Sequence, residues 1–429
     1  MRLLWVKFGG LWPLNSGGRL RSFNLLRELS REHAITVATT REQSRPPGLL
    51  ASQLPDCQEI IEVPYRPVKH RDPRFPFVLA KSWLTGMPVD MERARIPGLA
   101  SAVRSCLDTG GFDLCIADFL CSLPSVPLDG TVPVVLFEHN VEHMIWKRMA
   151  STCGSWPRRV LLEKEWRRVC RYERRGCAAV ERVITVSEAD RDLLRSMTAG
   201  GSIFAVPTGV DTQYFSPRQD IPERKEAVFV GSMDWFPNED AMRWFVEAVL
   251  PALRKRVPDA LVTVVGRNPS MKLTRDLQAY NVSVTGTVAD VRDFVARAAV
   301  CIVPLRVGGG TRLKIFEGLA MGKATVTTSV GAEGLPLVDG RDVVIADHPG
   351  EFAEQVSALM LDPVRRRQLG KAGRELVVSR YGWPRVAKEF DLLCQTACVR
   401  EITVSMAASR AGLSSGHHKS SRRPDFSSS

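Results

Sequence analysis

The sequence predicts an α/β protein with two domains, each a parallel sheet wound with helices on both faces. The first observation is length, because 429 residues are enough for two separate hydrophobic cores. The second is that short apolar runs alternate with amphipathic segments of helical spacing, which is typical of β-α-β units. The third is a loop rich in Pro, Gly and charged residues at 208–225, which divides the pattern into two series.

The first domain is predicted over residues 1–207. Its opening apolar run, Leu3–Phe8, leads through a Gly-containing loop to an amphipathic helix, and the run Ala34–Thr40 completes a β-α-β unit. Such a unit implies that the sheet is parallel. Further strands are expected at Leu114–Ala117, Val132–Phe137 and Val183–Val186.

The second domain is predicted over residues 226–382. Its strands are expected at Ala227–Val230, Leu261–Val265, Val282–Thr285, Val300–Pro304, Ala324–Thr328 and Val343–Ile345. The amphipathic segment 383–399 is predicted to be a helix that either caps the second domain or crosses back to the first. The Ser-rich remainder, 400–429, has little apolar content and is predicted to be disordered.

The composition is that of an ordinary globular protein, with 44% hydrophobic and 25% charged residues. Ten cysteines are scattered without a C-x-x-C spacing, so they are interpreted as free thiols. No apolar stretch approaches the roughly 20 residues of a membrane span. The N-terminal apolar run is broken by Lys7 and is too short for a signal peptide. A cytoplasmic location is expected.

The net charge of +12 is partly concentrated in one segment, 158–175, where eight basic residues face three acidic ones. Apolar residues lie among the arginines of this segment: Val160, Leu161, Trp166, Val169 and Tyr172. This mixture suits peripheral contact with an anionic membrane. The alternative is a solvated helix that packs through the same apolar residues.

The most informative chemical signal is a glycine run at the start of a helix in the second domain. The strand expected at Val300–Pro304 leads into Gly308–Gly310, and a helix begins at about Thr311. Glycines let backbone N–H groups approach an anion closely, and the helix N-terminus adds about half a positive charge at the same place. The alternative is a Gly-rich turn followed by a charged helix start.

Three side chains of that helix fit a nucleotide. Arg312 and Lys314 lie in its first turn, so a doubly charged phosphate group is the natural ligand. Glu317, one turn further on, is an acceptor suited to a pair of sugar hydroxyls such as a ribose diol. The usual phosphate motif G-x-x-x-x-G-K-[ST] is not present, and no G-x-G-x-x-G follows the first strand.

The stretch FEHNVEH fits a zinc-protease signature, His-x-x-Glu-His. In that interpretation His139 and His143 hold a metal and Glu142 activates water. However, His139 follows the strand expected at Val132–Phe137, and the helix is expected after Asn140, which leaves His139 outside it. His139 is therefore predicted at the C-terminal end of a strand, where ligands of open α/β sheets bind, and no metal is predicted.

Several segments together resemble motifs of one family, the retaining GT-B glycosyltransferases of glycosyltransferase family 4. The segment GGGTRLKIFEGLAMGK is similar to the family's diphosphate-and-ribose motif, VPTGVDTQYF to its interdomain motif, and SGG near the N-terminus to its first phosphate-side loop. FVGSMDWFPN and VVGRNP are similar to the loops that close around the donor. The resemblance extends over most of the chain, with several motifs in the same order.

The resemblance implies a fold and an activity. The fold is GT-B, in which two Rossmann-like domains face each other across a cleft and the first lies on the acceptor side. The activity is transfer of a hexose from a nucleotide diphosphate sugar to a saccharide or lipid-linked acceptor, with retention at the anomeric carbon and without a metal or other cofactor. The sequence GSMDWFPN is also similar to that of a subgroup associated with bacterial exopolysaccharide synthesis.

The same resemblance implies roles for individual residues. Arg312, Lys314 and the amides at 308–311 would neutralise the leaving diphosphate, and His139 would face the donor sugar from the first domain. The leaving phosphate itself would help to deprotonate the acceptor. The residues implied in donor binding are Gly17, Gly18, Gly231, Ser232, Gly266, Arg267, Gly309, Gly310, Thr311 and Glu317.

The sequence departs from the family pattern at several positions. Many members carry two glutamates flanking seven residues; Glu317 fits the second, but Gly309 occupies the first, which leaves the identity of the sugar open. Thr208 stands where the interdomain motif usually has Asn. Two alternatives remain: a nucleotide-sugar epimerase of the same fold, which needs no acceptor, and a non-enzymatic basic adaptor for nucleic acid or membrane.

Overall fold

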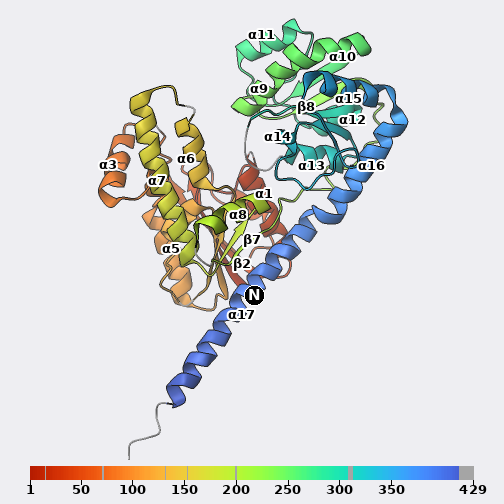
Figure 1. Ribbon diagram of the computed structural model, residues 1–429. Helices are drawn as coiled ribbons and strands as arrows, with labels where there is room; N and C mark the ends of the chain where they lie inside the picture. The colour runs from red at the N-terminus through yellow and green to blue at the C-terminus, as the bar shows by residue number, and fades with distance from the viewer. Residues whose placement is uncertain are drawn as a thin grey trace, which may run out of the picture.

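The computed structural model describes residues 1–414, except for 15, 70–71, 131, 152, 199–200 and 308–312, and for 399–414 it gives the helix alone. Two α/β domains lie side by side, and the long helix α17 (Trp383–Ser414) runs from the second domain along the first (Figure 1). Both domains are parallel sheets covered by helices, which confirms the predicted fold class.

In the described part of the first domain, seven parallel strands form one sheet in the order β3-β2-β1-β4-β5-β6-β7. The strands are β1 (Arg2–Lys7), β2 (Ala34–Glu42), β3 (Glu59–Tyr65), β4 (Leu114–Asp118), β5 (Val134–Phe137), β6 (Arg182–Thr185) and β7 (Ile203–Ala205). The helices are α1 (Gly17–Leu29), α2 (Leu49–Gln53), α3 (Phe75–Thr85), α4 (Val89–Ala94), α5 (Pro97–Thr109), η1 (Leu120–Ser125), α6 (Glu142–Ser151), α7 (Trp156–Ala179) and α8 (Glu188–Met197).

Strand β1 illustrates how this sheet is buried on both faces. Successive side chains of a strand point to opposite faces. Leu3 and Trp5 accordingly belong to the core cluster that includes residues of α1 and α17, whereas Leu4 and Val6 belong to a cluster that includes residues of α5 and η1. An apolar run without a polar face is therefore what a parallel sheet between two helical layers requires.

The second domain repeats the arrangement with strands in the order β10-β9-β8-β11-β12-β13. These are β8 (Arg224–Val230), β9 (Leu261–Val265), β10 (Ser283–Val284), β11 (Ala298–Val303), β12 (Ala324–Thr327) and β13 (Val344–Ile345). The helices are α9 (Phe236–Trp244), the π-helical turn η2 (Phe245–Val249), α10 (Leu250–Arg256), α11 (Met271–Ala279), α12 (Arg292–Arg297), α13 (Leu313–Ala320), α14 (Ser329–Ala332), α15 (Pro349–Leu361) and α16 (Pro363–Arg380).

The chain passes between the domains twice, at neighbouring points. Val210, in the predicted linker, forms an isolated parallel bridge with Gly382, which directly precedes α17. A Cβ atom on Gly209 would lie 2.6 Å from the Trp383 ring, so a side chain larger than hydrogen would collide there. Trp383 and Phe390 of α17 then join the core cluster of the first sheet.

Three features differ from the sequence-based expectation. Strand β3 is not predicted, because Glu59, Glu62 and Pro64 interrupt its apolar pattern at the edge of the sheet. Strand β7 has only three residues. The segment predicted as a helix over 383–399 crosses back to the first domain and continues helically to Ser414, so part of the predicted tail is helix. Residues 415–429 lie outside the described residues.

Candidate functional site

In the second domain, Lys314 and Glu317 lie three residues apart on α13 and line one hollow. The other walls of this hollow are largely apolar and come from the ends of β8 and β11 and from α12, with Val230, Val295 and Val303 among them. A charge pair with apolar walls experiences a lower effective dielectric than bulk water, which strengthens its interaction with a charged ligand.

Lys314 is oriented by residues of β8 and of the first turn of α9. Its Nζ atom donates a hydrogen bond to Asn238 Oδ1 at 2.7 Å and lies 4.3 Å from the centre of the Phe229 ring. A Cβ atom on Gly231 would lie 2.8 Å from Lys314 Nζ. The glycine therefore leaves room for the ammonium group between the loop after β8 and α13.

The remaining donor-side residues predicted in this loop and the next are adjacent in space. A Cβ atom on Gly266 would lie 1.7 Å from the carbonyl oxygen of Gly231, so the ends of β8 and β9 approach closely only because residue 266 is glycine. Arg267 Nε donates to Ser232 Oγ at 2.8 Å. Asn238, whose Nδ2 donates to the Ser232 carbonyl oxygen at 2.8 Å, is not among the residues predicted from the sequence, although it belongs to the segment FVGSMDWFPN.

Glu317 has an unusual electrostatic environment. Burial raises the pKa of its carboxyl to about 7, against the opposing effect of the Lys314 charge. The group therefore titrates close to neutral pH. The predicted phosphate-binding residues Gly308–Gly310, Thr311 and Arg312 lie outside the described residues.

In the first domain, a buried network occupies the carboxyl ends of β1, β4 and β5. Lys7 Nζ lies 3.1 Å from Asp118 Oδ2, and the other carboxylate oxygen lies 2.7 Å from His139 Nε2. Arg21 Nη1, from α1, lies 2.8 Å from His139 Nδ1. All four residues are at most 5% exposed, so the network is closed to bulk water.

The partners of His139 determine where its proton resides. A guanidinium group can only donate hydrogen bonds, so Nδ1 accepts from Arg21 and Nε2 carries the hydrogen that is donated to Asp118. This is a neutral imidazole, in keeping with a pKa that burial lowers to about 3. Burial alone would raise the pKa of Asp118, but Lys7 and His139 hold it below its usual value.

Phe119 covers this network and takes an uncommon backbone conformation. Its φ of 75° lies in the left-handed region, which is rare for a bulky residue and marks a position held by its surroundings. The ring stacks on His139 with 3.8 Å between ring centres. A Cβ atom on Gly18 would lie 2.4 Å from the same ring.

The two glycines predicted to approach the phosphates therefore have different surroundings. Gly18 gives room to Phe119, a group of the protein itself, and this accounts for glycine at that position. Gly17 is exposed at the start of α1, and a Cβ atom there would lie 3.8 Å from Leu313 of the second domain. Gly17 thus faces the segment that directly follows the predicted phosphate loop.

The structure places His139 after β5 and before α6, as predicted. The ring is buried, and both nitrogens have partners within the first domain. His143, in α6, has its Nδ1 atom 2.5 Å from Glu173 Oε2, which makes it an internal residue. Within the described residues, metal-ligand side chains converge at Glu32, His33 and Asp391, so the zinc-protease interpretation has no ligand set at the histidine pair.

Comparison with known proteins gives two family matches that follow the domain division. The model described as Glycosyltransferase Family 4 matches residues 16–214, and the model described as Glycosyl transferases group 1 matches residues 224–362. Together these ranges include most of the chain.

Two curated relatives are similar to parts of the chain. The GDP-mannose-dependent alpha-(1-6)-phosphatidylinositol monomannoside mannosyltransferase of Mycobacterium tuberculosis is 28% identical over 219 residues, 43% of this chain and 54% of the relative. The MMP alpha-(1->4)-mannosyltransferase of Mycolicibacterium hassiacum is 26% identical over 57% of this chain and 61% of the relative. The chain thus spans somewhat more than half the length of these relatives.

Solved structures share the fold over nearly the whole chain. Sucrose-phosphate synthase from Thermosynechococcus elongatus has a TM-score of 0.66 and 17% identity, and the match covers 92% of this chain and 98% of that chain. Anabaena HepE in complex with UDP has a TM-score of 0.63 and 11% identity, with 92% and 100% covered. The two sheets therefore adopt the two-domain GT-B arrangement.

Proposed function

Because this chain belongs to the family 4, group 1 glycosyltransferases, we propose that it transfers a hexose from a nucleotide diphosphate sugar to a saccharide or lipid-linked acceptor with retention. The observation that carries the proposal is the hollow at α13, where Lys314 and Glu317 lie side by side and Asn238 orients the ammonium group. One cation and one carboxyl at this spacing match a diphosphate joined to a ribose.

The chemistry assigned to this site is stabilisation of the leaving group. Negative charge grows on the diphosphate as the bond to the sugar breaks, and preorganised positive groups stabilise that charge most in a site shielded from water. Lys314 supplies one such group. Arg312, the amides at 308–311 and the helix N-terminus are proposed to supply the others.

We assign His139 a positioning role in the first domain. A direct contact with the sugar would require one ring nitrogen to exchange its present partner, Arg21 or Asp118. The network instead holds the His139 ring in place beneath Phe119, which lies beside Gly18. Phe119 and His139 together form a rigid surface, called here the wall. This wall would meet the sugar when the two domains close on the donor.

A panel of nucleotide diphosphate sugars tests the proposal, first by thermal shift and then by transfer to candidate acceptors. We expect one nucleotide to raise the melting temperature, and Lys314→Ala to reduce that shift. Conversion of the donor without any acceptor would favour the epimerase. Nucleic-acid or membrane binding that persists in Lys314→Ala, with no nucleotide bound by the wild type, would favour the adaptor.

Exopolysaccharide synthesis is the proposed pathway, supported by the sequence similarity of the GSMDWFPN loop. We also propose that segment 158–175 contacts an anionic membrane.

Among the described helices, none combines the length and apolar character that crossing a bilayer requires. In α7, Val169 is buried, whereas Trp156 is 76% exposed; in α3, Leu84 is 89% exposed. Arg168 joins the two helices through a 3.0 Å hydrogen bond to Ser82 Oγ.

A further inference from the structure

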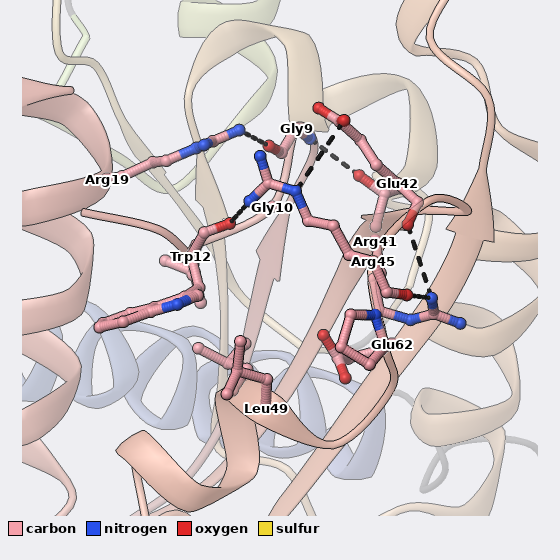
Figure 2. Close-up of a pocket in the computed structure, with 13 residues that line it drawn as sticks. Gly9, Gly10, Trp12, Arg19, Arg41, Glu42, Arg45, Leu49 and Glu62 are labelled. Atoms are coloured by element: carbon pink, nitrogen blue, oxygen red, sulfur yellow. Dashed lines mark hydrogen bonds and ion pairs between the residues drawn. The ribbon is translucent and has the colours of Figure 1, made fainter. Parts of the chain in front are cut away.

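The first domain contains a second hollow, at the carboxyl ends of β1, β2 and β3. Figure 2 shows Arg19 reaching toward it from α1 and Arg45 from the loop after β2. Arg41 and the carboxylates of Glu42 and Glu62 complete its charged lining. None of the residues named for donor binding or catalysis lines this hollow.

The shape of the hollow depends on a tight turn after β1. Gly9 and Gly10 both have positive φ, 89° and 75°, a conformation that side chains larger than hydrogen rarely adopt. Gly9 N–H donates to Thr40 Oγ1 at 2.9 Å, and a Cβ atom on Gly10 would lie 3.0 Å from the Thr40 carbonyl oxygen. The turn therefore lies against β2 and leaves space beside it.

Backbone carbonyl oxygens hold the two guanidinium groups at this turn. Arg19 Nη2 donates to the Gly9 carbonyl oxygen at 2.7 Å, and Arg45 Nη1 donates to the Trp12 carbonyl oxygen at 2.5 Å. Carbonyl oxygens orient a guanidinium without neutralising its charge. The carboxylate nearest to Arg45 is that of Glu42, with Nε and Oε2 3.9 Å apart.

The lining has an excess of positive charge. Three arginines, which remain protonated in proteins, lie beside two glutamates in this lining. Burial lowers the pKa of Arg19, and the nearby charge of Arg45 lowers it further. Like charges held this close repel one another, and an anion between them removes the repulsion.

One residue of the hollow, Arg19, is close in the chain to a point where the two domains approach each other. Arg19 lies in the first turn of α1, two residues after Gly17, whose backbone faces Leu313 of the second domain. Leu313 begins α13, which carries Lys314 and Glu317. The hollow thus lies in the first domain and shares no lining residue with the hollow at α13.

We propose that this hollow binds an oxyanion of the acceptor, a phosphate or a carboxylate, so that the acceptor is an anionic saccharide. Arg19 and Arg45 hold the oxyanion, and Trp12 and Leu49 offer apolar surface to the uncharged part of the same molecule. This inference rests on the proposed function, in which the first domain lies on the acceptor side.

Saturation-transfer NMR with three probes tests the inference on the full chain: glucose 6-phosphate, glucuronate and uncharged glucose. Saturable binding of either anion, with much weaker binding of glucose, is the expected result, and the stronger anion identifies the oxyanion. Arg19→Gln and Arg45→Gln should weaken anion binding roughly tenfold, the effect of one charge-assisted hydrogen bond. Arg31→Gln, at an exposed arginine paired with Glu28, is the matched control.

A second variant removes no hydrogen bond and therefore separates binding from folding. Leu49 is 41% exposed at the rim, and Leu49→Glu places a negative charge there that should repel both anions while the melting temperature stays unchanged. Equal anion binding by Arg19→Gln, Arg45→Gln, Leu49→Glu and Arg31→Gln would overturn the inference.

The nucleotide provides the last arm of the experiment. Saturating UDP or GDP should leave the anion bound, because the two sites are separate. Displacement of the anion by the nucleotide would make the hollow part of the donor site and would overturn the acceptor assignment. If anion binding persists but no nucleotide sugar binds or reacts, the proposed function fails while the oxyanion site stands.

Discussion

The two domains bring charged side chains to the same kind of position, the carboxyl ends of parallel strands, but they balance the charge in different ways. In the first domain Lys7 lies opposite the carboxylate of Asp118, and the pKa of Asp118 is held below its usual value. In the second domain Lys314 donates to a neutral amide, that of Asn238, while burial raises the pKa of Glu317.

We infer that this difference separates a network that is complete within the protein from a site that a ligand would complete. Charged side chains that are paired within the protein hold one another in a fixed position. Removing one partner leaves the other charge buried and uncompensated. Where burial holds a neighbouring carboxyl nearer its neutral form, as at Glu317, the site keeps capacity to bind an external anion. We therefore expect changes in the first network to affect stability most and changes at α13 to affect nucleotide binding most.

The largest expected effect is on stability in the first domain. Asp118→Asn keeps the size of the side chain but leaves Lys7 without its counter-charge, and should lower the free energy of unfolding by about 3–5 kcal/mol. Chemical denaturation measures the change. Asp108→Asn, at an exposed position of α5, is the matched control; equal stability of the two variants would contradict the closed network.

The second effect is on nucleotide binding. Lys314→Ala removes a charge-assisted contact worth about 1.5–3 kcal/mol, and should weaken binding and lower turnover by roughly tenfold or more. Arg312→Ala should do the same. Calorimetry with the nucleoside diphosphate measures the affinity, and wild-type binding and turnover in both variants would remove the basis for the diphosphate assignment.

A third prediction sets the two domains against each other directly. Glu317→Ala should weaken binding of the bare nucleoside diphosphate, because the ribose contact is present without the sugar. His139→Ala should leave that binding nearly intact and lower transfer. The reason is that the surface formed by His139 and Phe119 would contact the donor only when the sugar is present and the domains have closed. Calorimetry beside turnover separates the roles. Normal transfer by His139→Ala would disprove its assignment.

The fourth effect is a pH dependence of moderate size. The folded pKa of Glu317 is raised from 4.5 to about 7, so its contribution to the free energy of unfolding is fully present below pH 4.5 and is lost as pH rises to about 7. Ionisation makes the carboxylate a stronger acceptor for the ribose diol. Nucleotide affinity should therefore increase between pH 6 and 8 relative to Glu317→Gln, and parallel pH profiles would contradict this.

The smallest expected effect concerns the membrane. Leu161, within 158–175, and Trp156, at the start of the same helix, are exposed, so Leu161→Ser with Trp156→Ser should reduce co-sedimentation with anionic liposomes several-fold at low salt. The same changes at Leu361 and Leu392, which are also exposed, serve as the control. Binding that depends on neither anionic lipid nor salt would reject the contact.

Much of the fold follows from the sequence because buried parallel strands require continuous apolar runs. Strand β1 satisfies that requirement, whereas β3 does not, because an edge strand tolerates Glu59 and Pro64. Two of the glycines predicted on the donor side can be recognised from the sequence for a similar reason. Close approaches at Gly231 and Gly266 leave no space for a side chain, so the constraint is visible in the residue itself.

The first-domain network was mostly beyond sequence reasoning. Asp118 and Phe119 contact residues that are distant in the chain. The positive φ of Phe119 cannot be predicted from the sequence, because phenylalanine rarely adopts it. Lys7 did offer a signal. A lysine at the end of an apolar strand must find a buried carboxylate or lose its charge, yet in the sequence it appears only to interrupt the hydrophobic run.

The paired crossings at Val210 and Gly382 have a mechanical consequence. Because the two covalent connections lie side by side, a change of backbone angle at this one place would be enough to rotate one domain relative to the other. Trp383 lies against Gly209 at this place, and α17 then packs into the core of the first domain, so α17 would stay with the first domain in such a rotation. The rotation would change the separation of Gly17 and Leu313, which face each other from the two domains.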